Sequence, residues 1–248
     1  MKSYALTYPQ LMGELLDRGV SEDDARRVAR AYDAAVGMTR DLFRPSGASF
    51  LGHLIRTASI ALAHTGDSTM ATAALLHATY ALGGTGGAIA RLTRRAERGS
   101  LRRLVGSPVE EIVFAYDFLP WTEEGALPTH IERHAAYSGT QRQALILRVA
   151  NELEDQLDAA MCFRAGGLQE SVRRRARWAA ELSRALNLPA LGGELDAAID
   201  EAETRRVPPH MRTGKTMGYR SSWRNLPELV GLRRYLRAVA EGRRRRTA

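Results

Sequence analysis

Two histidines, His53 and His77, are the residues of this chain whose type and spacing most clearly suggest chemistry. Each lies in an apolar stretch with helical periodicity, FLGHLIRTASIAL and MATAALLHATYAL, and the two are 24 residues apart. Two such helices can direct both imidazoles at one buried point, where they would bind a metal ion or act as acid/base groups. Ala78 and Thr79 follow His77, so the carboxylate that a metal centre of this kind needs is missing there.

A second set of polar side chains falls on a long predicted helix over residues 139–164. A stripe at helical spacing, with two acids beside it, comprises Leu147, Asn151, Asp155 and Asp158, flanked by Glu152 and Glu154. Asp155 or Glu152 could approach the histidines, whereas the alternative is that these acids are solvated or pair with arginines. The catalytic candidates are therefore His53, His77 and Asn151, and the ligands of any bound metal would be His53, His77 and Asp155.

Basic residues near His53 suggest a site for an anion. Arg44 precedes His53, and Arg56 lies almost one helical turn after it, so both are expected to bind a phosphate or carboxylate. Lys215 and Arg220 lie among aromatic residues near the C-terminal end and could clamp an anionic ligand or partner. The alternative for this second pair is a solvated basic tail.

Three other motifs carry weaker signals. His130 and His134 stand one helical turn apart, which is metal-ligand spacing, although such a pair is usually on the surface. Cys162 is the single cysteine, so it excludes an intramolecular disulfide framework and indicates a small buried side chain. The string TGKT at 213–216 lacks the first glycine and the preceding strand of a phosphate-binding loop, and that interpretation is rejected.

The elements that position these residues are all predicted to be helices. They are expected over residues 7–18, 21–43, 49–65, 68–82, 108–119, 139–164, 167–187 and 192–206, with a last short helix at 226–241. Ser21 and Ser107 have the sequence context of N-caps, and Gly66 with Asp67 forms a turn between the two histidine helices. No alternating β-branched run offers a strand, so the fold class is all-α.

Charge divides the chain into two parts. Of 36 basic and 28 acidic residues, positions 205–248 hold 13 and 2, a net charge of +11, which leaves 23 and 26, or −3, for positions 1–204. We expect a near-neutral helical domain at 1–204 and a basic tail at 205–248 that could bind nucleic acid or an acidic protein. The sequence has no apolar run of about 18 residues and no signal peptide, which predicts a cytoplasmic protein that does not enter a membrane.

The run RPSGASFLGHLIRTASIALAHTGDSTMATAALLHATY at 44–80 resembles the HD superfamily of metal-dependent phosphohydrolases. It looks most like the hydrolase domain of Rel/SpoT-type alarmone enzymes, through Arg44, Ser46, Gly47, Phe50, His53, Leu75, Leu76 and His77. The segment 148–153 is similar to the helix that carries the family's last metal ligand. The combination of LVGSPVEEIVFAYDFLPW with VANELEDQLD is also similar to actinobacterial proteins with a degenerate form of this domain, and the arginine-rich composition suggests such a high-GC genome. The resemblance implies an HD-domain-like helical bundle with a basic C-terminal extension.

The chain departs from this family at the positions that hold the metal. The family uses two histidines and two aspartates, and here Ala78 and Asn151 replace the aspartates. Ala81 and Leu82 replace an acidic pair that serves acid/base chemistry in the alarmone hydrolases. Two neutral histidines and an amide hold a hard divalent ion weakly, so we expect no bound metal or other cofactor. The two histidines would then be bonded to each other or to Asn151.

Three functions follow from this interpretation. The first is a degenerate HD-fold protein that binds a small anionic ligand, nucleotide-like or phosphorylated, or a partner. The second is a divergent enzyme, either a metal-dependent phosphohydrolase or a biosynthetic-pathway enzyme, that uses the His53 and His77 pocket. The third is binding of nucleic acid or a carrier protein through the basic tail.

Overall fold

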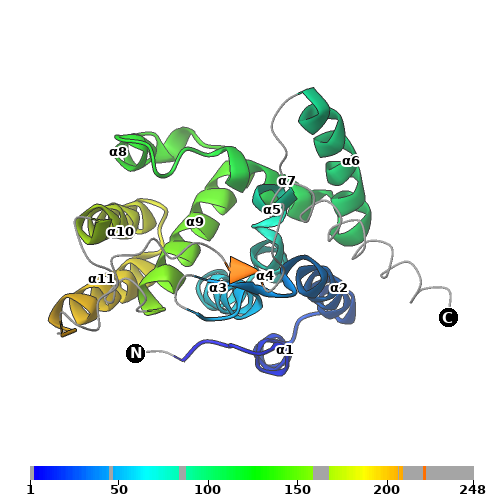
Figure 1. Ribbon diagram of the computed structural model, residues 1–248, viewed down its shortest axis with the longest axis horizontal. Helices are drawn as coiled ribbons and strands as arrows, with labels where there is room; N and C mark the ends of the chain where they lie inside the picture. The colour runs from blue at the N-terminus through cyan, green and yellow to red at the C-terminus, as the bar shows by residue number, and fades with distance from the viewer. Residues whose placement is uncertain are drawn as a thin grey trace.

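The protein is an all-α molecule, as the sequence predicts, in the computed structural model (Figure 1), which describes residues 3–44, 47–83, 88–158, 168–205, 207–208 and 220–221. Its helices are α1 (Tyr8–Asp17), α2 (Glu22–Thr39), α3 (Phe50–Thr65), α4 (Ser68–Leu76), α5 (Thr79–Gly83), α6 (Ala88–Val105), α7 (Ser107–Phe118), α8 (Ala126–Glu132), α9 (Gly139–Leu157), α10 (Leu168–Ala185) and α11 (Pro189–Thr204). A short 3-10 helix, η1 (His134–Ala136), links α8 to α9.

The two histidine helices, α3 and α4, form the centre of the bundle. Helix α3 packs against α4 and α9, and α4 also packs against α2 and α7. Both helices are apolar on nearly every face, and Leu54, Ile60, Met70 and Leu75 are fully buried. A helix that is apolar all round is stable in water when its neighbours cover it, so this pair must lie inside the molecule.

Local capping sets where these helices begin and turn. The side chain of Ser49 accepts a hydrogen bond from the Gly52 amide at the start of α3, and the Asp67 side chain accepts one from Thr69 at the start of α4. Between them, Gly66 adopts a left-handed conformation with φ of 67°, which glycine tolerates without strain. The predicted turn at Gly66 and Asp67 is confirmed, and it folds α4 back along α3.

Helix α9 packs against both histidine helices. Leu145, Val149 and Leu153 recur every four residues along this helix and are fully buried, so they form its core stripe. Leu157 lies at the end of this stripe, half-buried against the core. The helix begins at a capping box formed by Ser138 and Gln141 and packs against α3, α4, α7 and α11. The predicted end of this helix at 164, with Cys162, lies outside the described residues.

Helix α6 is a part of the fold that the sequence did not predict. Its many arginines hid the helical pattern in the sequence. The buried side of this helix includes Leu101 and Val105. The predicted cap of the next helix was also shifted by one residue, since Gly106 with φ of 91° is the N-cap of α7 and Ser107 lies inside it. Helix α8 likewise lies between the helices predicted at 108–119 and 139–164, where the sequence predicted none.

One two-strand pairing accompanies the helices in the described part of the chain. Strand β1 (Leu42–Phe43) pairs antiparallel with β2 (Arg220–Ser221), with Leu42 opposite Ser221 and Phe43 opposite Arg220. The sequence predicted no strand at either place. The helix expected at 226–241 and the residue Lys215 fall outside the described residues. Within the described part of the chain, no helix has the length and hydropathy needed to cross a membrane.

Candidate functional site

His53 and His77 lie side by side in the interior, as the sequence predicts. His53 is in the first turn of α3, and His77 is the C-cap residue of α4. Their ring centroids are 5.3 Å apart at an interplanar angle of 75°, and the two residues are 7% and 4% exposed. Phe50 packs on one side of this pair and Tyr116 of α7 on the other. The site is therefore a buried pair of imidazoles with aromatic walls.

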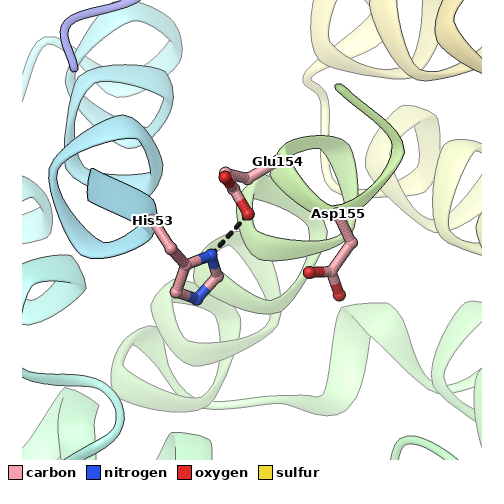
Figure 2. Close-up of side chains that lie close together, drawn as sticks. All are labelled: His53, Glu154 and Asp155. Carbon is pink, nitrogen blue, oxygen red and sulfur yellow. Dashed lines mark hydrogen bonds and ion pairs between the residues drawn. The ribbon is translucent and has the colours of Figure 1, made fainter. Parts of the chain in front are cut away.

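Neither imidazole has the hydrogen-bond partner that the sequence predicted. The Nδ1 atom of His77 lies 2.7 Å from the carbonyl oxygen of Ala74, and a carbonyl can only accept, so this nitrogen carries the proton. The Nδ1 atom of His53 is bonded to the Oε2 atom of Glu154 (Figure 2). The Arg44 guanidinium donates to the same oxygen, which identifies that oxygen as an acceptor. Both imidazoles thus leave Nε2 as the nitrogen with the lone pair.

Glu154 and Asp155 of α9 are the carboxylates nearest to His53. One ligand atom from each of His53, Glu154 and Asp155 can be chosen so that all three lie within 4.8 Å of one another (Figure 2). Asp155 therefore lies close to His53, and so does Glu154. Glu152 does not, because its carboxylate accepts hydrogen bonds from Arg175 of α10 and Trp121.

Asn151 lies one turn before these two acids on the same side of α9. Its Oδ1 atom is buried and has no hydrogen-bond partner among the described residues. An expected hydrogen bond between this oxygen and the histidines is therefore absent among the described residues. A buried carbonyl oxygen without a donor is costly, so a donor from outside the described protein atoms would stabilise it.

Arg44 contacts the acids of α9 rather than standing free for an anion. Its guanidinium donates to Glu154 at 2.5 Å and to Asp155, and it lies 3.3 Å from an oxygen of Asp158. The alternative reading of the acidic run, pairing with arginines, is thus correct for all four acids, including Glu152. Arg56 lies 3.6 Å from the other oxygen of Glu154, with a side chain that is 21% exposed.

Burial dominates the electrostatics of the site. It lowers the pKa of His53 to about 3, and the positive charge of Arg44 adds to this effect. Burial and the neighbouring His53 also lower the pKa of His77 to about 3. In the opposite direction, burial raises the pKa of Glu154 and raises that of Asp155 to about 6. Both imidazoles are consequently neutral at physiological pH.

The remaining candidates lie elsewhere or outside the described side chains. Both ring nitrogens of His130 are bonded, Nδ1 to the Tyr137 hydroxyl at 2.6 Å and Nε2 to the Pro120 carbonyl at 2.7 Å. The weak suggestion of a metal site at His130 and His134 is therefore wrong for the first of the two. Lys215 and the side chain of Arg220 are not among the described parts of the chain.

A divalent metal does not fit the arranged residues. The two Nε2 lone pairs and the Asn151 oxygen are suitable donors, but they carry no negative charge. The carboxylates that could supply it, on Glu154, Asp155 and Asp158, are each paired with the Arg44 guanidinium. A permanent cation in contact with the same oxygens repels a second cation, so no reaction step is assigned to a metal here.

Comparison with known proteins gives two findings. A family model described as a domain of unknown function, DUF6817, matches residues 38–120, about a third of the chain. This range holds Arg44, His53, Arg56 and His77 and ends before α9. A solved structure of a metazoan SpoT orthologue, reported to hydrolyse ppGpp and to play a role in starvation responses, is similar at 19% identity and a TM-score of 0.49. The similarity covers 71% of this chain and 94% of that one. No curated protein matches the sequence.

Proposed function

We propose that this chain is an HD-like protein that binds a small anionic ligand beside His53 and His77 and does not hydrolyse phosphoesters with a metal there. Support for the HD-like assignment comes from the pair of imidazoles on consecutive helices and from α9 packed across both. Support for the loss of metal chemistry comes from Arg44, which engages the carboxylates near His53.

The anion proposal rests on how few contacts the Arg56 guanidinium makes with the protein. Among the described residues its guanidinium makes one ion pair, the 3.6 Å contact to Glu154, and no hydrogen bond. A guanidinium has five N–H donors in a planar fork that matches phosphate and carboxylate groups. Arg56 lies one turn after His53 on α3, so an anion held by it would rest next to the imidazole pair.

The imidazoles and Asn151 would recognise another part of the same ligand. The Nε2 atoms of His53 and His77 are acceptors, and so is the buried Oδ1 of Asn151. Acceptors favour a ligand with hydroxyl or amino donors, which a phosphorylated sugar or a nucleotide carries beside its phosphate. Proton transfer by these imidazoles is a weaker alternative, because a pKa near 3 is far from the value that suits a general base at neutral pH.

Calorimetric titration with pyrophosphate, GDP and ATP tests the proposal. We expect at least one of them to bind the wild-type chain, and Arg56→Gln to weaken that binding about 10- to 100-fold, because a hydrogen bond to a charged group contributes about 1.5–3 kcal/mol. The matched control is Arg177→Gln on α10, whose guanidinium pairs with Glu203 at 2.7 Å on the surface. Equal affinities for wild type and Arg56→Gln, or no binding of any of the three probes, would reject the assignment.

A further inference from the structure

We infer that the Arg44 guanidinium is the resident cation of this site and excludes a divalent metal from His53, Glu154 and Asp155, which would otherwise hold one. This deepens the proposed loss of metal chemistry and does not depend on anion binding, because it concerns metal content and the carboxylates of α9.

The ligand atoms have the spacing that a single ion requires. Imidazole nitrogens and carboxylate oxygens bind divalent metals at about 2.0–2.6 Å, so two donors on one ion lie at most about 5 Å apart. The three ligand atoms of His53, Glu154 and Asp155 lie within 4.8 Å of one another. One neutral nitrogen and two anionic oxygens form the kind of ligand set that the sequence had appeared to lose with Ala78 and Asn151.

Arg44 neutralises these oxygens in place of a metal. Its side chain is 13% exposed and contacts Glu154, Asp155 and Asp158 at once. Two adjacent carboxylates, of which Glu154 is buried and Asp155 half-buried, repel each other and are costly without a cation. A guanidinium remains charged at every physiological pH, so it satisfies this requirement permanently.

The backbone before α3 holds Arg44 in that place. The Arg44 amide donates to the Ala48 carbonyl at 2.8 Å, and the Gly47 amide donates to the Arg44 carbonyl at 2.9 Å. Gly47 has φ of 89°, in the region that favours glycine, and Phe43 forms a bridge with Ser49 on either side of this turn. These contacts fix the backbone of Arg44, and the ion pairs with Glu154 and Asp155 hold its guanidinium.

The test replaces Arg44 by Met, which keeps the aliphatic stem and removes the charge. Binding of Mn²⁺ is followed by the loss of the free-ion electron paramagnetic resonance signal and by metal analysis after desalting. We expect wild type to bind no Mn²⁺ at concentrations up to about 1 mM and Arg44→Met to bind about one ion per chain, at least tenfold more tightly. Adding Glu154→Gln or His53→Gln to Arg44→Met should abolish the new site.

Two further variants control this experiment. Arg175→Met frees the buried carboxylate of Glu152 on the same helix but leaves it away from His53, so it should gain no metal. Arg44→Lys retains the positive charge and should also gain none. If Arg44→Met is unfolded without metal, the inference requires Mn²⁺ to restore its helical circular dichroism. A folded Arg44→Met that binds no Mn²⁺, an unfolded one that Mn²⁺ does not rescue, or equal uptake by Arg175→Met would overturn it.

Discussion

At the scale of single residues, the surroundings of His77 disfavour a positive charge on its ring. Its Nδ1 proton is committed to the Ala74 carbonyl, and His53 and Tyr116 enclose the rest of its ring. Arg148 stacks on Tyr116 with its guanidinium carbon 3.9 Å from the ring centroid, and it adds positive charge to the surroundings. The fold therefore accepts the neutral imidazole and disfavours the imidazolium.

This preference predicts a dependence of stability on pH. The folded pKa of His77 is about 3, below the value of about 6.5 in an unfolded chain, so the unfolded state binds more protons between these values. Stability that is present above pH 6.5 is lost as the pH falls, by roughly 1.4 kcal/mol per pH unit from this group.

Urea unfolding of wild type and His77→Gln between pH 7 and pH 4 isolates this contribution. The glutamine does not titrate, so the difference in unfolding free energy between the two proteins should shrink toward acid pH. Burial raises the pKa of Asp155, so this group has the opposite effect on the pH dependence of stability. Both proteins contain Asp155, and its effect cancels in the comparison. A difference that stays constant over this range would show that His77 is not held neutral by the fold.

At the scale of helices, the contact between α6 and α7 depends on one buried carboxylate. Glu110 of α7 is fully buried and accepts hydrogen bonds from Arg98 and Arg102 of α6 and from the Tyr80 hydroxyl at 2.8 Å. Although burial raises the pKa of Glu110, these donors hold it below the ordinary value for a glutamate.

Removing this carboxylate should loosen α6. We expect Glu110→Ala to lower the free energy of unfolding by about 3 kcal/mol, because several donors lose a charged acceptor in the interior. Glu111→Ala is the matched control, since its side chain is 49% exposed and lies 3.9 Å from Arg102. That change should cost less than about 0.5 kcal/mol. Equal losses for the two variants in urea unfolding would contradict the role given to Glu110.

Helix faces also explain how far the sequence predicts the site. The apolar periodicity of α3 and α4 and the turn at Gly66 are local signals, and they correctly bring His53 close to His77. Which side of α9 faces His53 depends on how α9 is rotated about its axis against α3. That rotation is set by packing between two helices that lie about 100 residues apart in the sequence. Spacing alone therefore left Glu152 and Asp155 equally eligible and placed Glu154 at the side of the stripe.

Two further features had no local signal that identified them. The pairing of Arg44 with Glu154 joins residues 110 positions apart, and nothing in the RPSG segment reveals its partner. Helix α6 was missed because its arginines resemble a solvated segment, whereas Arg98 and Arg102 in fact reach the buried Glu110. Spacing at i, i+3, i+4 and i+7 on residues 151, 154, 155 and 158 is the signal that could have identified the acidic face of α9.

At the scale of the whole molecule, the positive charge of the sequence is concentrated toward its C-terminal end. The net charge of +11 at residues 205–248 contrasts with −3 over the rest of the chain. Binding of nucleic acid or an acidic protein by this tail stays a prediction of the sequence. The described backbone of β2 nevertheless pairs with β1, the strand that immediately precedes Arg44. The central part of the molecule is a helical core in which the buried Glu110, Glu152 and Glu154 pair with its own arginines.

The metal content of the purified wild-type chain tests this balance most directly. The protein would be expressed in medium supplemented with manganese and zinc, desalted, and analysed by inductively coupled plasma mass spectrometry. We expect less than about 0.1 metal ion per chain, because Arg44 already serves Glu154 and Asp155 as their cation. About one tightly bound ion per chain, lost in His53→Gln, would contradict it.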